Sequence, residues 1–418
     1  MDPGFDQRRG FCPSLRTPME SGDGLLVRLS VRALSSEQLR ELVRLAAACG
    51  NGLIEITRRG NLQLRGLREA TLPQLRHGLN ALNALSALGI ADAHASLVVH
   101  PLSGLHRACA SLDALAAEVG QALEGVHGLS DKFGVVLDSG GLLRELAADV
   151  RVDVEPSTPQ TATLRAATHV LGCCDVRDVP GTVRALAETL ARSEFSRMRE
   201  LIAARGTAAL PACSASSLPP SAAVRLEPPQ LIGGHEDPAW LGLALPFGSG
   251  DAAPWSALAD VAARFGSGEV RFTPFRGVIL PGVRARQGQA EAQQLAGEAG
   301  WITDPHDPLL RAIACPGAPA CASARGDTRR LARELLPLLP PSPLAAANAR
   351  LHVSGCSKGC AHSGPASITL VCDARGARLG FDASTAAAAE NPALPLETVR
   401  ARLFALAKTG EKSQARAS

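Results

Sequence analysis

The sequence predicts an α+β protein with two copies of a half-domain and two larger α/β units, arranged with pseudo-twofold symmetry. Two stretches match without a gap at a constant offset, so that Leu25 corresponds to Leu241 and Gly52 to Gly268. Within each copy, apolar residues alternate in some segments and recur every three or four residues in others, which is typical of strands and helices. A similar succession of strand, helix and strand follows each copy.

The elements of the first copy are a strand, a helix and two further strands. We expect the strands at 25–29, 52–57 and 62–66, with the helix between the first two strands carrying Leu39, Leu42 and Ala46. The second copy repeats this order, with strands at 241–245, 268–273 and 278–282 and a helix that carries Trp255, Leu258 and Ala262. Because a small sheet must bury one face, each copy has to pack against another part of the chain.

The α/β units follow the two copies in the same order. After the first copy we expect a strand ending at His100-Pro101, a helix near 112–123 and a strand at 132–137. After the second we expect a strand at 313–316, a helix near 328–336 and a strand at 350–353. A stretch rich in Pro, Ser and Ala separates the halves and predicts a linker. The predicted boundaries are 20–90 for the first half-domain, 91–206 for its α/β unit, 207–233 for the linker, 234–304 for the second half-domain and 305–408 for the last α/β unit.

Composition excludes several classes of protein. The chain has 418 residues, 46% of them hydrophobic and 20% charged, which indicates a globular protein and excludes general disorder. A net charge of only +3 and an aromatic content of 3% argue against a nucleic-acid partner. No apolar run reaches the roughly 18 residues of a membrane helix, and the N-terminus lacks a signal pattern. We therefore expect a cytoplasmic protein with no membrane association.

Of the 11 cysteines, four are paired in glycine-containing segments. Cys315 and Cys321 are separated by five residues, and Cys356 and Cys360 by three. The others we interpret as packing residues: Cys12, Cys49, Cys109, Cys213, Cys372 and the pair Cys173-Cys174. Four thiolates suit tetrahedral zinc or an iron–sulfur cluster, and the five-residue gap favours the wider cluster. Unliganded core cysteines are the remaining alternative.

Several phrases resemble the sulfite and nitrite reductase superfamily. They are the two cysteine pairs, Leu53–Arg58, Asn61–Gly66 and Lys132-Phe133. Three further phrases resemble one branch of it more closely, the precorrin-3B synthases of aerobic cobalamin biosynthesis: Thr273–Leu280, Ala314–Pro319 and Ser354–His362. The resemblance spans residues 24–371 and implies ferredoxin-like half-domains and two sulfite-reductase-like α/β units.

The resemblance also implies a cofactor and a reaction. Cys315, Cys321, Cys356 and Cys360 would ligate a [4Fe–4S] cluster, and a mononuclear non-haem iron whose ligands we cannot name is allowed. The implied reaction is the hydroxylation of precorrin-3A at C20 with dioxygen, with closure of a γ-lactone. No glycine-rich nucleotide loop opens a βαβ unit, so electrons would come from an external donor, either NADH or a reductase or ferredoxin.

Two departures from the reductase pattern argue against a small-anion reductase. Ala95-Ser96 stands where reductases have an Arg-Asn pair, and Gly134 stands where they have a second lysine. The alternatives are nevertheless kept open: a sirohaem-dependent sulfite or nitrite reductase, and a non-catalytic tetrapyrrole-binding protein with a structural metal.

A precorrin carries several carboxylates, so its site needs fixed cations, for which arginine is well suited. The candidate substrate-binding residues are Arg28, Arg58, Arg59, Arg65, Lys132, Arg276 and Lys358. His362, two residues after Cys360, is the candidate acid, base or metal ligand. His100 and His352 are weaker candidates, and a solvated or hydrogen-bonded side chain is the alternative for each of these residues.

Overall fold

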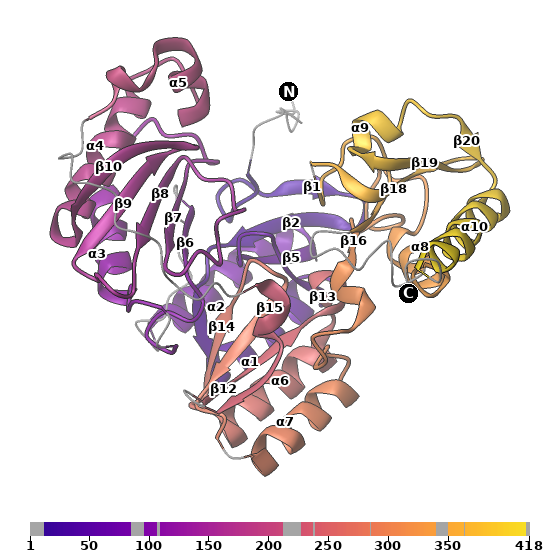
Figure 1. Ribbon diagram of the computed structural model, residues 1–418. Helices are drawn as coiled ribbons and strands as arrows, with labels where there is room; N and C mark the ends of the chain where they lie inside the picture. Colours follow the sequence, from indigo (N-terminus) through magenta and orange to yellow (C-terminus); the bar gives the residue numbers. More distant parts are fainter. Residues whose placement is uncertain are drawn as a thin grey trace. The chain divides into compact units, whose positions relative to one another are not determined.

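The structure, a computed structural model, contains two compact units (Figure 1). The first comprises Met1–Met19 and Leu26–Pro305, and the second Glu20–Leu25 and His306–Ser418. The described residues are 12–84, 96–106, 109–211, 227–236, 239–284, 286–339, 350–362 and 364–414. Ala95, Cys213 and residues 212–226 of the predicted linker lie outside them.

The first half-domain begins with three short strands and a helix, α1 (Ser36–Cys49). Ser35 caps α1, because its hydroxyl accepts from the backbone N–H of Gln38 (3.1 Å) while the Gln38 side chain accepts from the Ser35 N–H (2.9 Å). Leu39 and Leu42 on the inner face of α1 are fully buried. The other elements are β1 (Met19–Ser21), β2 (Gly24–Leu29), β3 (Ala33–Ser35), β4 (Ile54–Ile56), β5 (Leu62–Leu67) and α2 (Leu72–Ala84).

The second half-domain confirms the predicted duplication. Its helix α6 (Ala252–Phe265) begins at the residue that corresponds to the first residue of α1, and both helices have 14 residues. The other elements are β11 (Gly233–Glu236), β12 (Ala239–Ala244), β13 (Ser249–Gly250), β14 (Glu269–Phe272), β15 (Gly277–Pro281) and α7 (Arg286–Glu298).

The two half-domains exchange one strand each. The sheet of the first copy has the order β1-β2-β5-β4-β13, and that of the second has the order β11-β12-β15-β14-β3. Ser249 of β13 pairs with Glu55, and Ala33 of β3 pairs with Arg271. Helices α1 and α6 also pack against each other. A chain cut between the halves would therefore leave each sheet without one strand.

The two α/β units have the same topology. In each, three parallel strands are followed by two antiparallel ones, and a helix connects the first strand to the second. The first unit contains β6 (Ser96–Val99), α3 (Asp113–Leu123), β7 (Gly134–Asp138), β8 (Val150–Val154), β9 (Thr161–Ala166), β10 (His169–Asp175), α4 (Val179–Ala191) and α5 (Met198–Arg205). The second contains β16 (Ala312–Ala314), α8 (Thr328–Leu335), β17 (Leu351–Ser354), β18 (Ala366–Asp373), β19 (Gly376–Ala383), α9 (Thr385–Ala388), β20 (Ala393–Leu394) and α10 (Leu396–Gln414).

Short 3-10 turns connect several of these elements, at Glu69–Thr71, Val176–Asp178, Thr207–Ala209, Pro228–Leu231, Pro246–Gly248, Pro308–Arg311 and Leu336–Leu338. The fold is thus the α+β architecture of duplicated half-domains and α/β units that the sequence predicts. No helix within the described ranges is long and apolar enough to cross a membrane.

Both faces of the first α/β sheet are buried. Helices α3, α4 and α5 cover one face with a core that includes Phe133, Val135 and Val152. The other face packs against the second half-domain through Val136, Trp240 and neighbouring apolar residues. Burial on two sides explains why the central strand β7 contains an uninterrupted apolar run, Val135-Val136-Leu137.

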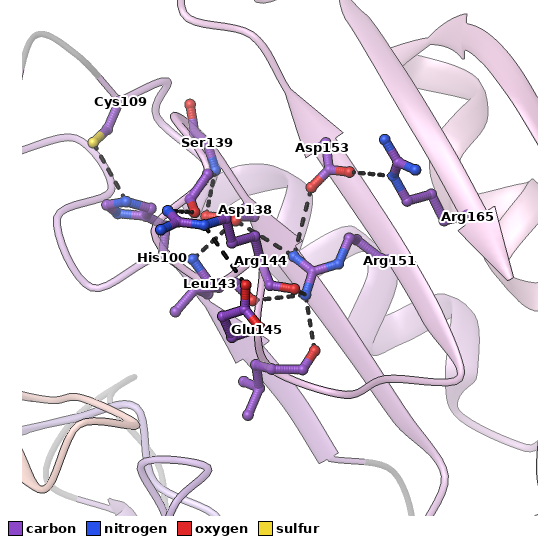
Figure 2. Close-up of polar contacts among 12 residues, drawn as sticks. His100, Cys109, Asp138, Ser139, Leu143, Arg144, Glu145, Arg151, Asp153 and Arg165 are labelled. Carbon is purple, nitrogen blue, oxygen red and sulfur yellow. Dashed lines mark hydrogen bonds and ion pairs between the residues drawn. The ribbon is translucent and has the colours of Figure 1, made fainter. Parts of the chain in front are cut away.

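A buried polar network lies at the end of β7 (Figure 2). Asp138 is 1% exposed and accepts from the backbone N–H groups of Ser139 (2.9 Å) and Leu143 (3.0 Å). The Arg151 guanidinium lies 3.4 Å from the Asp138 carboxylate and donates to the backbone oxygen of Leu143 at 2.6 Å. Burial raises the pKa of Asp138 to about 7, against the opposing effect of Arg151. The pair therefore depends on both partners.

Replacing Arg151 with alanine should destabilise the fold strongly. It leaves the Asp138 carboxylate buried without its cation, a change that typically costs about 3–5 kcal/mol. Arg165→Ala is the control, because Arg165 pairs with Asp153 (3.1 Å) at a site where the arginine is 37% exposed, and such pairs contribute about 1 kcal/mol or less. The free energy of unfolding in urea measures both effects. If both variants lost the same free energy of unfolding, Arg151 would not be the essential partner of the buried Asp138 carboxylate.

Candidate functional site

The four clustered cysteines lie on two loops of the second α/β unit. Cys315 and Cys321 are on the loop between β16 and α8, and Cys356 and Cys360 follow β17. Because β16 and β17 are neighbouring parallel strands, both loops leave the same edge of the sheet. The fold thus brings together two cysteine pairs that the whole of α8 separates in the sequence.

Backbone groups hold the two loops against each other. The Gly355 N–H donates to the Cys315 sulfur at 3.2 Å, and the Arg325 N–H donates to the Gly355 oxygen at 2.8 Å. Gly317 has a φ of 72°, and a Cβ at this position would lie 2.7 Å from the backbone nitrogen of Thr328. Glycine is therefore required there for both conformation and space. An N–H aimed at a cysteine sulfur is what an iron–sulfur ligand needs.

The sulfur atoms share one electrostatic environment. Partial burial raises the pKa of the Cys360 thiol, and the thiols of Cys356, Cys315 and Cys321 raise it further, whereas Lys358 lowers it. None of the described cysteines forms a disulfide. Four thiols around two glycine turns are a chemically suitable ligand set for a [4Fe–4S] cluster, in which each thiolate binds its own iron.

Two residues near the N-terminus contact the first cysteine loop, and the sequence contains no local pattern that identifies them. The Ser21 hydroxyl donates to the Ala320 oxygen at 2.9 Å. A Cβ at Gly22 would lie 2.7 Å from the Ala322 nitrogen and from the Pro319 oxygen. This segment therefore packs tightly on the loop that carries Cys321.

Lys358 and His362 also belong to this unit. The Lys358 ammonium donates to the Ser323 hydroxyl at 3.0 Å, so it connects the second cysteine loop to the first. The His362 Nε2 lies 3.0 Å from the Pro365 oxygen, and its ring meets that of the fully buried His352 edge-on at 5.6 Å. The ring of His362 is thus held beside the Cys360 loop, where a role as acid or base stays a prediction.

In the first α/β unit, His100 occupies the position of Cys315. The backbone N–H of His100 donates to the backbone oxygen of Leu137 in the neighbouring strand (2.9 Å). The N–H of Cys315 donates in the same way to the backbone oxygen of Val353 (3.4 Å), so the two residues hold equivalent positions. Its Nδ1 accepts from a backbone N–H, and its Nε2 lies 3.6 Å from the Cys109 sulfur. Burial lowers the pKa of His100 to about 3 and raises that of Cys109 to about 12. This unit therefore has a neutral, hydrogen-bonded pair at the position where the other unit has a candidate cluster cysteine.

Two adjacent arginines lie on the turn between β4 and β5. The turn is closed by a hydrogen bond from the Thr57 N–H to the backbone oxygen of Asn61 (2.8 Å). Neither Arg58 nor Arg59 forms an ion pair with any described residue. Partial desolvation lowers the pKa of both guanidinium groups, although Arg58 keeps an exposed surface. Arg28 donates to the Gln63 side chain at 2.9 Å. None of these three arginines forms an ion pair with a carboxylate in the described part of the chain, which leaves their charges available to an anion.

Lys132 and Arg65, two further basic candidates of the first compact unit, differ in exposure. Lys132 is exposed before β7, and its backbone N–H donates to Ser130. Arg65 is 3% exposed and forms a buried ion pair with Glu55 at 3.5 Å. Since breaking such a pair is costly, we leave Arg65 out of the proposed substrate-binding set.

Arg276 has a left-handed backbone. Its φ is 61°, and by the offset of the two copies it corresponds to Gly60, whose φ is 73°. The same turn therefore uses glycine in one copy and arginine in the other. A bulky residue in this region is strained, and such strain concentrates at functional sites.

Replacing Arg276 with glycine should separate stability from binding. The melting temperature should stay the same or rise, because the strain of a non-glycine residue, about 1 kcal/mol, is relieved. Substrate affinity should fall, because the guanidinium is lost. Thermal unfolding and a binding titration check the two parts, with Arg271→Gly in regular β14 as the destabilising control. A stability loss without any loss of affinity would show that Arg276 is structural.

Comparisons with known proteins agree with this architecture. The model of the nitrite/sulfite reductase ferredoxin-like half-domain matches residues 17–82 and 234–296, one match in each copy. A precorrin-3B synthase from Sinorhizobium sp is 32% identical over 385 residues, which cover 87% of this chain and 81% of that protein. The chain belongs to the precorrin-3B synthase family. The prediction from the sequence that the chain belongs to the precorrin-3B synthase branch of the sulfite and nitrite reductase superfamily is thereby confirmed.

Reductases are more distant relatives of this family member. The chloroplastic ferredoxin–nitrite reductase of Oryza sativa is 23% identical over 379 residues, covering 78% of this chain and 62% of the reductase. A sulfite reductase haemoprotein β-component from Xylella fastidiosa is 33% identical over 121 residues, 27% of this chain and 21% of its own. The Mycobacterium tuberculosis NirA protein has the same fold, with a TM-score of 0.69, 18% identity and coverage of 85% of this chain and 73% of its own.

In this precorrin-3B synthase family member, the candidate residues are divided between the two compact units. The cysteines, Lys358 and His362 belong to the second unit, whereas Arg28, Arg58, Arg59, Lys132 and Arg276 belong to the first. Ser96 is described but its neighbour Ala95 is not, so the structure covers only part of that departure from the reductase pattern.

Proposed function

We propose that this protein catalyses the oxygen-dependent hydroxylation of precorrin-3A at C20, with closure of the γ-lactone by the ring A acetate, in cobalamin biosynthesis. The observation that carries the proposal is the similarity to a precorrin-3B synthase along 87% of the chain. Arg58 and Arg59, which form no ion pair with a described residue, support it, because a polycarboxylate macrocycle needs such cations.

We also propose that Cys315, Cys321, Cys356 and Cys360 hold a [4Fe–4S] cluster. A cluster of this kind supplies single-electron transfer when it is bound. The chain's own contribution is the thiolate set and the N–H of Gly355, which points at the Cys315 sulfur. No three His, Cys, Asp or Glu side chains in the described part of the chain lie close enough to hold a single metal ion, and we assign no ligands to a mononuclear iron.

The proposed role of the basic residues is to bind and orient the macrocycle. Arg58 and Arg59 would pair with its carboxylates, assisted by Arg28, Arg276 and Lys132. Fixed orientation matters because only one meso carbon is to be oxidised, and holding it in place lowers the entropic part of the barrier. Lys358 and His362 stay proposals for substrate binding and proton transfer at the cysteine loops.

The proposed reaction balances with an external donor. One oxygen atom of dioxygen enters the macrocycle as the C20 hydroxyl, and the other leaves as water after taking two electrons and two protons. The ring A acetate closes the lactone by adding its carboxyl oxygen to the macrocycle; its proton stays in the product, so this bond needs no leaving group and no further oxidant. The donor would be NADH or a reductase or ferredoxin, and a cytoplasmic location fits the thiol-rich site.

The absorption spectrum of anaerobically purified protein tests the cofactor proposal against its alternatives. A broad blue-region shoulder with equal amounts of iron and acid-labile sulfide is expected. Sharp visible bands would indicate sirohaem and hence a reductase, and a colourless protein containing zinc would indicate a structural metal. Incubation with precorrin-3A, dioxygen and a reductant should then give the hydroxylated lactone, with sulfite and nitrite left unreduced.

A further inference from the structure

The Arg59 guanidinium lies where a side chain of residue 134 would be. A Cβ built on Gly134 would be 2.5 Å from Nη1 of Arg59 and 3.2 Å from its Cζ. Gly134 is the first residue of β7, and its φ is not in the left-handed region. The backbone therefore does not need glycine here. A glycine inside a strand otherwise weakens it and often marks a close approach by another group, which is Arg59 in this case.

Arg59 forms no ion pair within 4 Å with any residue that the structure describes. Its Nη2 donates to the Ala147 oxygen at 2.9 Å, whereas its buried Nη1 has no acceptor among the described residues. The nearby Asp149 carboxylate is already used by Arg197, whose Nε and Nη2 lie 3.0 and 2.9 Å from its oxygens. The backbone N–H groups of Gly134 and Met198 also donate to Asp149.

Holding such a cation without a counter-ion is unfavourable. Burial is the main cause that lowers the pKa of Arg59, and the neighbouring Arg197 lowers it further, whereas the Asp149 carboxylate opposes this shift without reversing it. The cost is offset when an anion binds, because a charge-assisted bond to a carboxylate is among the stronger hydrogen bonds in proteins. The turn at Thr57 fixes the base of the side chain, since the Arg59 N–H lies 3.3 Å from the Thr57 hydroxyl.

We propose that Gly134 is a positioning residue for substrate specificity: it leaves the space in which Arg59 is held to bind a carboxylate of the tetrapyrrole. The inference rests on the proposed function for the identity of the ligand. Any side chain at position 134 displaces the guanidinium, so the effect of Gly134 operates through Arg59.

A double-mutant cycle tests this dependence. The variants are Gly134→Ala, Arg59→Ala and the double variant, with Gly120→Ala in α3 as the control, because a Cβ at Gly120 meets nothing within 4 Å. The readout is titration with precorrin-3A under anaerobic conditions, followed by visible absorption. Each single substitution should weaken binding about ten- to a hundredfold, the range for a lost charge-assisted bond. Gly134→Ala should have no further effect in the Arg59→Ala background.

The remaining outcomes overturn the proposal in different ways. If Gly134→Ala weakens binding equally in both backgrounds, it acts on the strand and not through Arg59. If Arg59→Ala binds precorrin-3A with wild-type affinity, Arg59 is not part of the site. This result can be obtained even if Gly134→Ala does not fold, because it needs only the Arg59→Ala variant. In both of these cases the proposed function still stands. Wild-type protein that does not bind precorrin-3A refutes the proposed function and this inference together.

Discussion

Replacing Cys321 with serine is expected to give a protein without its iron–sulfur cluster. Serine is a hard oxygen ligand and a poor substitute for thiolate on iron. Cys321 and Cys315 lie on the same loop. The hydrogen bond from the Gly355 N–H to the Cys315 sulfur does not involve Cys321, so the loop should stay folded in this variant. Iron and acid-labile sulfide analysis of the anaerobic protein measures the loss. Cys356→Ser should behave in the same way.

Two other cysteines provide controls for this prediction. Cys372 lies in the same unit, but burial and the nearby Cys315 thiol raise its pKa to about 11, so it stays protonated. Cys173 is buried in the first α/β unit, with its sulfur 3.4 Å from the Thr163 hydroxyl. Cys372→Ala and Cys173→Ser should keep full iron and sulfide. Full cluster content in Cys321→Ser would refute the four-cysteine ligand set.

Replacing Arg58 with alanine is expected to weaken precorrin binding by about ten- to a hundredfold, equivalent to about 1.5–3 kcal/mol for a lost charge-assisted pair. Arg58 is exposed and has no ion pair among the described residues, so its charge is available to a carboxylate. Arg58→Lys should recover only part of the affinity, because an ammonium lacks the planar fork. Substrate titration by visible absorption provides the measurement.

The matched control is Arg177, whose side chain is 88% exposed and pairs with Asp175 at 2.8 Å. Arg177→Ala should bind substrate as the wild type does. The cluster spectrum should be the same in all of these variants, because the cysteines belong to the other compact unit. Unchanged affinity in Arg58→Ala would exclude Arg58 from the site.

The sequence predicts the duplicated fold well because the evidence for it is local. The alternation of apolar residues in β4 and β5 and their helical spacing in α1 recur at a constant offset in β14, β15 and α6. The exchange of β3 and β13 between the sheets was not predictable in this way. Those strands have three and two residues, too short for a periodic pattern, and their partners lie in the other copy.

The candidate site was only partly predictable for a related reason. Spacing identifies the four cysteines, and the offset between the copies places Arg276 opposite Gly60. The contact of Ser21 with Ala320 joins residues 299 positions apart and has no local pattern. The buried pair of Arg65 and Glu55 is likewise visible only in the folded sheet, where a predicted substrate contact has a partner within the protein.

The most direct test of the proposed activity is the reaction of iron-loaded protein with precorrin-3A, a reductant and dioxygen labelled with heavy oxygen. Mass spectrometry of the product determines the origin of its new oxygen atom. The account predicts one labelled atom in the macrocycle, at the C20 hydroxyl, with unlabelled oxygen in the lactone carboxyl. Unchanged precorrin-3A, or a product whose new oxygen comes from water, would contradict it.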